Sequence, residues 1–353
     1  MKGIILHGGH GTRLRPLTHT GPKQLLPIAN KPMSQYCLES LIDAGITEIA
    51  IIIGGIGANK VQEYYGDGSK FGSKISYIVQ DQPRGIAHAI KLCKEFVGNE
   101  SFVVFLGDNI IKKSISEYVL QFANSDADAS ILLCEVDNPT QFGIADVKDG
   151  IIKKIMEKPK NPPTNLAVTG IYLLKPVIFD IINRLKPSWR NEYEITDSLQ
   201  MLLEEGHKIT YHTITDYWKD TGTPQDIIHA NEILLSDMKS YFHGIQEEGS
   251  KISGITMIDD GTIIKKGSEI IGPVIIGKNC TIGAGARIGP NTSIGENSKL
   301  TKCDIESSII MSGCNIDGNI KVRNSIIASN SDIVNNAGDG KVFLLGEGTK
   351  ISL

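Results

Sequence analysis

Several residue patterns are missing from this 353-residue sequence, and each absence excludes a class of protein. The six cysteines include no Cys-x-x-Cys pair and no Cys/His cluster at zinc spacing, so we expect reduced core cysteines rather than a zinc site or a redox pair. No apolar run approaches the roughly 20 residues of a membrane span. The N-terminal apolar run is also too short for the core of a signal peptide. We therefore expect a soluble, cytoplasmic protein.

The sequence also lacks any block of basic residues. Its formal net charge is -4, which argues against nucleic acid as a partner. Hydrophobic residues make up 41% of the chain and charged residues 22%, as is usual for a globular protein. The length suggests two domains, and two parts of the chain do follow different patterns.

Residues 1–235 alternate strand-like and helix-like stretches. Strands are predicted at 3–6, 48–53, 75–79 and 102–106, and helices at 35–44, 59–65 and 86–96. This βαβ alternation predicts an α/β fold with a Rossmann-like, mostly parallel sheet covered by helices. Ligands of such sheets bind beyond the carboxyl ends of the strands, and Leu6 and Leu106 each close a strand of this kind.

Residues 251–334 repeat an aliphatic residue at every sixth position. The repeat runs through Ile252, Ile258, Ile264, Ile270, Ile276, Ile282, Ile288, Ile294 and Leu300, slips at Ile305 and Ile310, and resumes at Ile316 and Val322. Glycines fall at turn-like positions beside it, at Gly272, Gly277, Gly283, Gly289 and Gly295. A hexapeptide β-helix has this period, with three short faces per coil. We predict one domain over 1–238 and a β-helix domain over 251–353, whose residues 335–353 cap the solenoid.

A glycine cluster, GGHGTR at residues 8–13, follows the first strand. Such glycines let successive backbone N–H groups face an anion. Arg13 adds a planar fork of donors for phosphate oxygens, and Lys23 supplies a further cation. A dinucleotide fingerprint would need glycine where Leu14 stands, and a Walker loop would need Gly-Lys-Ser/Thr, so both motifs are excluded. Taken alone, the cluster also suits a structural turn.

A longer pattern is more specific. Residues 8–32 read GGxGTRLxPxT…PKxLxPIxxKP and resemble the signature of sugar-1-phosphate nucleotidylyltransferases. Within that family the chain is most similar to the glucose-1-phosphate thymidylyltransferases of the long form, which end in a left-handed β-helix. The resemblance covers nearly the whole chain. It implies that a nucleotidyl group passes from dTTP or UTP to glucose 1-phosphate, with release of pyrophosphate and with Mg²⁺ as cofactor.

The resemblance also implies a nucleotide site. Its residues are Leu6, Gly8, Gly9, Gly11, Thr12, Arg13, Lys23, Gln80, Pro83, Gly85, Gly107 and Asp108. The amide of Gln80 would read the pyrimidine edge, because it offers both a donor and an acceptor, and Gly85 would leave room for the ring. Without the family match, Gln80 would be an ordinary loop residue. His7 departs from the family, which usually has a small residue before the two glycines, and we expect it to pack beside the loop.

The metal and sugar sites rest on the same resemblance. Asp108 and Asp220 would bind Mg²⁺, which commonly takes one or two carboxylates. On its own, either residue would be a turn or a helix cap. The sugar phosphate would lie among Gly143, Glu157, Lys158, Val168, Arg190 and Glu192. Glu157 would bind sugar hydroxyls, whereas Lys158 and Arg190 would bind the phosphate. The catalytic set is then Arg13, Lys23, Asp108, Lys158 and Asp220.

The implied reaction is an in-line attack by the sugar-phosphate oxygen on the α-phosphorus. No nucleophilic side chain or general base is needed, because a phosphomonoester with a second pKa near ~6 is already largely dianionic. The difficulty is to bring two anions together. Lys158 and Arg190 would hold one anion, and Arg13, Lys23 and Mg²⁺ the other, so catalysis is positioning and charge neutralisation.

Two other functions stay open. Hexapeptide β-helices often carry acyltransferases with a histidine base, but the last of the eight histidines, His243, precedes residue 251, so an oligomerisation or regulatory role is favoured. A non-catalytic sugar-nucleotide sensor is the second alternative. The sequence does not decide between dTTP and UTP, whose bases differ by one ring methyl group worth about 1–3 kcal/mol. The hexose, the pathway and the subunit number also stay open, although a homo-oligomer is expected.

Overall fold

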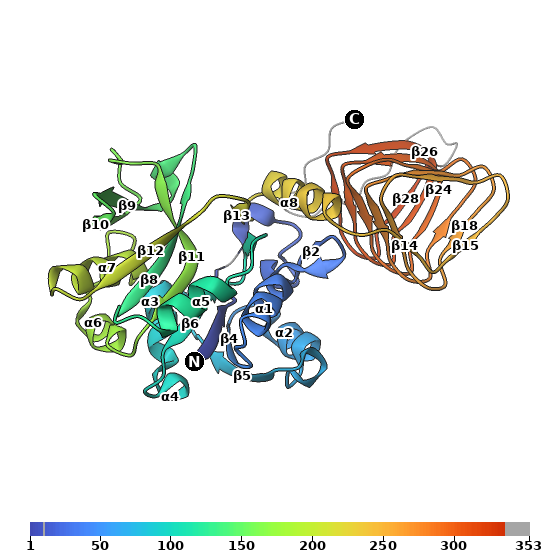
Figure 1. Ribbon diagram of the computed structural model, residues 1–353. Helices are drawn as coiled ribbons and strands as arrows, with labels where there is room; N and C mark the ends of the chain where they lie inside the picture. The colour runs from blue at the N-terminus through green and yellow to red at the C-terminus, as the bar shows by residue number, and fades with distance from the viewer. Residues whose placement is uncertain (10, 336–353) are drawn as a thin grey trace. The chain divides into compact units, whose positions relative to one another are not determined.

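The computed structural model describes residues 1–9 and 11–335 (Figure 1). The chain forms two compact units, which are described separately. The first comprises Met1–His10, Thr20–Leu25 and Met33–Asp220, and the second comprises Gly11–His19, Leu26–Pro32 and Thr221–Leu353. None of the helices in the described part is long and apolar enough to cross a membrane.

The first unit is built on a nine-stranded mixed sheet, whose main path runs β10-β9-β11-β6-β1-β4-β5. Strands β1 (Lys2–Leu6), β4 (Glu48–Ile53), β5 (Lys74–Val79) and β6 (Phe102–Leu106) run parallel to one another. The remaining strands are β8 (Ala129–Glu135), β9 (Gly143–Lys148), β10 (Ile151–Glu157), β11 (Leu166–Leu174) and β12 (Ile209–Ile214). Strand β11 runs antiparallel to β6, β8 and β9, and β12 runs parallel to β8. The predicted Rossmann-like α/β fold is confirmed.

Helices pack on this sheet. They are α1 (Met33–Asp43), α2 (Ala58–Tyr65), α3 (Ile86–Leu92), α4 (Lys94–Val97), α5 (Ser116–Ala123), α6 (Ile178–Arg184) and α7 (Ile195–Glu204). Short 3-10 helices lie at η2 (Lys23–Leu25), η3 (Ser69–Phe71) and η4 (Pro139–Gln141). The single helix predicted over 86–96 is two helices, because the backbone of Cys93 (φ -87°, ψ 2°) leaves the helical region between them.

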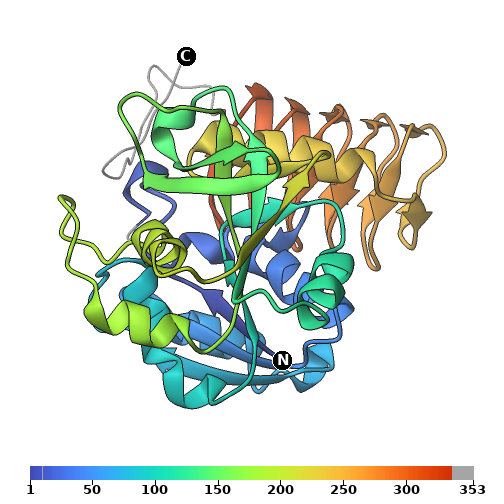
Figure 2. The ribbon, with the colours of Figure 1, turned by 60° about the vertical axis from the view of Figure 1, so that its left-hand side comes forward.

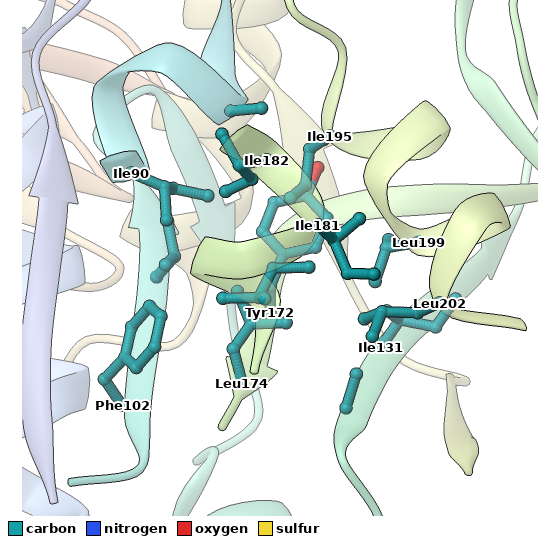
Figure 3. Packing of buried hydrophobic residues seen from close by; sticks show 14 of the residues in the cluster. Ile90, Phe102, Ile131, Tyr172, Leu174, Ile181, Ile182, Ile195, Leu199 and Leu202 are labelled. Atoms are coloured by element: carbon teal, nitrogen blue, oxygen red, sulfur yellow. The ribbon is translucent and has the colours of Figure 1, made fainter. Parts of the chain in front are cut away.

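Alternation along the strands gives each face of the sheet its own core. On β1, Ile4 and Leu6 contribute to one cluster and Ile5 to the other. Figure 3 shows the first cluster, in which side chains from β6, β8 and β11 meet those of α3, α6 and α7. Continuous apolar runs such as 102–106 are therefore buried on both faces of the sheet. The polar residues that follow such a run lie at the carboxyl end of its strand.

The second unit contains the predicted solenoid, and its stacked parallel strands are visible in Figure 2. One sheet joins β14 (Tyr241–Phe242), β17 (Thr256–Ile258), β20 (Val274–Ile276), β23 (Thr292–Ile294), β25 (Ile309–Ile310) and β27 (Ile326–Ile327). The other joins β15 (Ile245–Gln246), β16 (Lys251–Ser253), β18 (Ile263–Ile264), β19 (Glu269–Ile271), β21 (Thr281–Ile282), β22 (Arg287–Ile288), β24 (Lys299–Glu306), β26 (Asn315–Arg323) and β28 (Asp332–Val334).

The register of these strands explains the sequence repeat. Ile252 lies beside Ile270, and Ile270 beside Ile288, so one coil takes three hexapeptides. The slip in the repeat is a real shortening of the coils, since Ile288 pairs with Ile305 and Ile294 with Ile310. The parallel sheets agree with the predicted β-helix.

The five glycines that accompany the sequence repeat are not there to allow a left-handed backbone conformation. Positive φ at the corners belongs to residues such as Asn279, Asn291 and Asn297, and to none of the glycines named above. A Cβ at Gly277 would instead lie 2.7 Å from the backbone nitrogen of Glu296 in the next coil. Gly277 is therefore required by the close approach of the neighbouring coil.

The solenoid begins ahead of residue 251. Strands β14 and β15 pair with β17 and β18, so the first coil contains His243, which the sequence analysis placed before the solenoid. The second unit also holds η1 (Thr12–Leu14), the β2 (Pro27–Ile28) and β3 (Lys31–Pro32) hairpin, and α8 (Pro224–Ser236). The domain limits 1–238 and 251–353 stay a prediction, and the proposed cap over 335–353 lies outside the described residues after Asn335.

Candidate active site

One pocket of the first unit opens beyond the carboxyl end of β6. The lining is Ile86, Leu106, Asp108, Asn109, Gln141, Phe142, Gly143, Glu157, Lys158, Val168, Gly170, Tyr172, Arg190, Glu192, Glu194, Ile195, Thr196, Trp218 and Asp220. Eight of these residues are the predicted Asp108, Asp220, Gly143, Glu157, Lys158, Val168, Arg190 and Glu192. The fold thus brings together side chains that the sequence spreads over more than a hundred positions, although their roles stay predictions.

A short antiparallel pair brings the two aspartates to this pocket. Strand β7 (Asn109–Ile111) pairs with β13 (Trp218–Asp220), and Asp220 lies opposite Asn109. Asp108 forms an ion pair with Lys23, and its Oδ1 accepts a 2.9 Å hydrogen bond from Asn109 Nδ2. Burial opposes ionisation of Asp108, but the ion pair with Lys23 outweighs it and holds the pKa of the carboxyl below its usual value.

The two carboxylates fit the magnesium expectation. Mg²⁺ takes one or two carboxylates and completes its shell with phosphate oxygens and water, and both Asp108 and Asp220 line the pocket where such a ligand would lie. No group of three or more His, Cys, Asp or Glu side chains suited to a metal occurs among the described residues. Among the described residues, a metal ion at this pocket would therefore need ligands besides His, Cys, Asp and Glu side chains, such as phosphate oxygens or water.

Asn109 is a buried residue of the pocket that the sequence did not point to. It is 2% exposed, and its Oδ1 accepts hydrogen bonds from Trp218 Nε1 at 2.8 Å and from the backbone nitrogen of Gly170 at 3.1 Å. Its Nδ2 holds Asp108, as described above. One amide in the pocket lining thus joins Asp108 to strands β11 and β13. No local pattern marks it, because Gly170 and Trp218 are distant from it in sequence.

Part of the pocket wall is a cluster of charges around Arg190. Its Nη1 lies 3.0 Å from Glu157 Oε1 and 3.5 Å from Glu194 Oε1, and its Nη2 lies 3.1 Å from Glu192. Thr196 Oγ1 donates a 2.9 Å hydrogen bond to Glu157 Oε2. Burial, followed by the charge of Glu194, raises the pKa of Glu157. Such a cluster offers both acceptors for hydroxyl groups and a cation for a phosphate.

Lys158 completes this wall. Its ammonium lies 4.0 Å from Glu157 Oε1, and its backbone has φ 39°, in the left-handed region. Its backbone nitrogen donates to the carbonyl oxygen of Phe142 at 3.1 Å. A non-glycine residue held in this conformation beside a pocket is often part of a functional site, because the surrounding structure has to enforce it.

The predicted base-recognition segment follows β5. Gln80 is 8% exposed, and its Nε2 lies 3.0 Å from His88 Nδ1. Gly85 has φ +98°, and a Cβ there would lie 2.5 Å from the carbonyl oxygen of Tyr193. Tyr193 in turn donates its N–H to Arg84 O at 2.8 Å. Gly85 is therefore required by the contact with Tyr193, which ties this segment to the Arg190 loop. Pro83 is exposed.

The phosphate loop is divided between the units. In the first unit, Leu6 accepts a 3.0 Å hydrogen bond from the backbone nitrogen of Gly107, Gly8 O accepts one of 2.9 Å from Gln24 Nε2, and Gly9 has φ +88°. Gly11, Thr12 and Arg13 belong to the second unit. There Gly11 O accepts a 2.8 Å hydrogen bond from Thr18 Oγ1. The assignment of these three residues to the nucleotide site stays a prediction.

His7 packs as the sequence analysis expects. Its ring is 4% exposed and lies edge-on to Tyr65, with 6.1 Å between ring centroids. Burial lowers the pKa of His7 to about 3, and the charge of Asp108 offsets this only in part. Neither ring nitrogen has a hydrogen-bond partner among the described residues. The imidazole is therefore neutral at physiological pH and acts as a packing group.

Comparison with known proteins identifies the family of the chain. The sequence model of the family described as "Nucleotidyl transferase" matches residues 2–237. The chain belongs to this family. A second model, the "GMPPB C-terminal domain", matches residues 270–352.

Two curated relatives span the whole chain. The "Low-salt glycan biosynthesis nucleotidyltransferase" of Haloferax volcanii is 44% identical over 100% of both chains. A "Glucose-1-phosphate thymidylyltransferase" of Streptomyces antibioticus is 38% identical over 100% of this chain and 99% of its own. Among solved structures, UDP-glucose pyrophosphorylase complexed with UDP-glucose is 28% identical, with a TM-score of 0.60 over 67% of this chain and 99% of its own. This nucleotidyl transferase is thus similar to enzymes of nucleotide-sugar metabolism.

Proposed function

We propose that the protein transfers a nucleotidyl group from dTTP or UTP to glucose 1-phosphate and releases pyrophosphate. The supporting observation is one pocket that is lined both by two carboxylates, Asp108 and Asp220, and by the Arg190 cluster. The two carboxylates suit a divalent cation with its bound phosphates. The Arg190 cluster suits a ligand that carries both hydroxyl groups and a phosphate. The names of the Streptomyces and pyrophosphorylase relatives favour glucose 1-phosphate over another hexose phosphate.

The proposed chemistry is a single displacement at phosphorus. An oxygen of the sugar phosphate forms a bond to the α-phosphorus, and the bond from that phosphorus to the bridging oxygen breaks as pyrophosphate leaves. Lys158 and Arg190 bind the attacking phosphate, and Arg13 and Lys23 bind the triphosphate. Asp108 and Asp220 would hold Mg²⁺, which supplies further neutralisation of phosphate charge. All of these groups act by position and charge.

The Arg190 cluster sets a condition on substrate binding. Arg190 is already paired with Glu157, Glu192 and Glu194, so an incoming phosphate has to share this guanidinium with them. Hydroxyl groups of the sugar can donate to the carboxylate oxygens at the same time. A ligand that carries both groups satisfies the cluster better than inorganic phosphate does, which favours a sugar phosphate as the second substrate.

Compartment and assembly are also part of the proposal. The six cysteines are free thiols, in agreement with a reducing compartment, and we place the reaction in the cytoplasm. Phe242 and Ile245 lie on the edge strands β14 and β15 and are 43% and 60% exposed. Exposed apolar residues on strand edges favour association, so we propose a homo-oligomer.

A matrix of four nucleoside triphosphates against several sugar 1-phosphates, read by pyrophosphate release, tests the proposal. We expect release with dTTP or UTP and glucose 1-phosphate, and none when either substrate is omitted. Absence of release for every pair would refute the proposed function. A parallel assay with acetyl-CoA and amino-sugar phosphates tests the acyltransferase alternative, which matters because His243 lies within the first coil.

A further inference from the structure

The guanidinium group of Arg13 lies against Gly222, and both residues belong to the second unit. A Cβ placed on Gly222 would lie 2.9 Å from Arg13 Nη2, 3.1 Å from Cζ and 3.2 Å from Nη1. Gly222 is buried, and its φ lies outside the left-handed region, so the backbone would accept alanine. The three atoms nearest to such a Cβ all belong to the guanidinium group of Arg13. Any side chain at this position would push the guanidinium aside.

Gly222 is fixed to the start of helix α8. The next residue, Thr223, forms a capping box with Asp226: Thr223 Oγ1 accepts from Asp226 N at 3.2 Å, and Thr223 N donates to Asp226 Oδ2 at 2.9 Å. Pro224 occupies the first turn, where its fixed φ suits the helix. Gly222, against which the guanidinium of Arg13 lies, is therefore held in place by the first turn of α8.

The middle of α8 is bonded to the β-helix through Asn231, which is fully buried. Its Oδ1 accepts hydrogen bonds from Ala29 N and from Ser293 Oγ, both at 2.8 Å. Its Nδ2 donates to the carbonyl oxygen of Asn291 at 3.1 Å. Ser293 belongs to strand β23 of the solenoid, and Ala29 to the turn of the β2–β3 hairpin. One side chain thus joins a helix, a coil and a hairpin.

Apolar contacts and further hydrogen bonds strengthen this junction. Ala29, Leu235, Met257 and Ile275 form one buried cluster between hairpin, helix and coil. Asn30 Nδ2 also donates to Ile294 O at 2.7 Å. Figure 1 shows α8 next to the coils of the solenoid. Gly222 and Asn231 are nine positions apart, about 14 Å at the helical rise, so a stiff α8 links the seat of Arg13 to the coil.

We propose that α8 is a strut through which the β-helix positions the guanidinium of Arg13 for nucleoside triphosphate. Gly222 and Asn231 are its two positioning residues. The inference rests on the proposed function, in which Arg13 binds the triphosphate. It gives the solenoid a part in nucleotide affinity, which an assembly role alone would not.

The test compares Gly222→Ala and Asn231→Ala with the control Gln225→Ala, an exposed position on the same helix. For each variant, kcat and KM are measured separately for the triphosphate and for the sugar 1-phosphate, together with thermal unfolding. Displacement of one charge-assisted donor predicts a roughly 10- to 100-fold rise in the triphosphate KM for Gly222→Ala. We expect a smaller rise for Asn231→Ala, wild-type values for Gln225→Ala, and a sugar-phosphate KM within about twofold throughout.

An unchanged triphosphate KM in folded Gly222→Ala and Asn231→Ala would overturn the proposal. So would an equal rise in both KM values, because it would indicate general damage. If Asn231→Ala does not fold, Ser293→Ala replaces it, since this change removes only one of the three hydrogen bonds. Lack of pyrophosphate release by the wild-type protein would instead refute the proposed function, so the two failures are distinguishable.

Discussion

Protonation of His7 should dominate the loss of stability on the acid side. The buried ring has a pKa of about 3, whereas a histidine in an unfolded chain titrates near 6.5. The native state therefore binds fewer protons than the unfolded state between these values. The sign follows directly: the stability from neutral His7 is complete above about pH 6.5 and is lost as the pH falls toward 3. The slope is about 1.4 kcal/mol per pH unit, or roughly 2.5 kcal/mol between pH 7 and 4.5.

His7→Phe removes this titration and keeps a ring beside Tyr65. Urea unfolding of both proteins, followed by tryptophan fluorescence from pH 7 to 4.5, measures the effect. We expect the free energy of unfolding of the variant, relative to wild type, to rise by about 2–3 kcal/mol over this range. Parallel pH profiles for the two proteins would refute the reasoning, because they would show that His7 gains no proton on unfolding.

Three further predictions concern the pocket. Asn109→Ala leaves the indole N–H of Trp218 and one backbone N–H buried without an acceptor, so chemical unfolding should show a loss of about 2–6 kcal/mol; a loss below about 1 kcal/mol would contradict the junction described for Asn109. Gly85→Ala forces a Cβ to 2.5 Å from Tyr193 O at φ +98°, and thermal unfolding should show destabilisation of at least about 1 kcal/mol, whereas an unchanged midpoint would argue against this contact. Asp108→Asn should abolish Mg²⁺-dependent turnover, and a normal magnesium titration would remove it from the metal site.

Much of the fold was predictable because local patterns decide it. The strand over 48–53 has the predicted limits, since a continuous apolar run with β-branched residues is buried on both faces. The six-residue period predicted the coil, because each inward position repeats around three faces. The break at Cys93 was not predictable, because the helical pattern continues through it.

The candidate site was predictable only in part. Family motifs point to Asp108, Glu157 and Arg190, and the pocket unites them. Asn109 escaped notice, because its hydrogen bonds to Gly170 and Trp218 come from other strands. The place of Arg13 was equally hidden: its seat on Gly222 joins residues more than two hundred positions apart, and no local pattern reports such a contact.

The central claim is attack on the α-phosphorus of a nucleoside triphosphate, and a labelling experiment tests it most directly. The protein is incubated with Mg²⁺, glucose 1-phosphate and dTTP or UTP labelled at either the α- or the γ-phosphate. The account predicts that the α label appears in the nucleotide sugar and the γ label in pyrophosphate. A γ label found in a sugar bisphosphate or in orthophosphate would contradict it, because the protein would then be a kinase or a phosphatase.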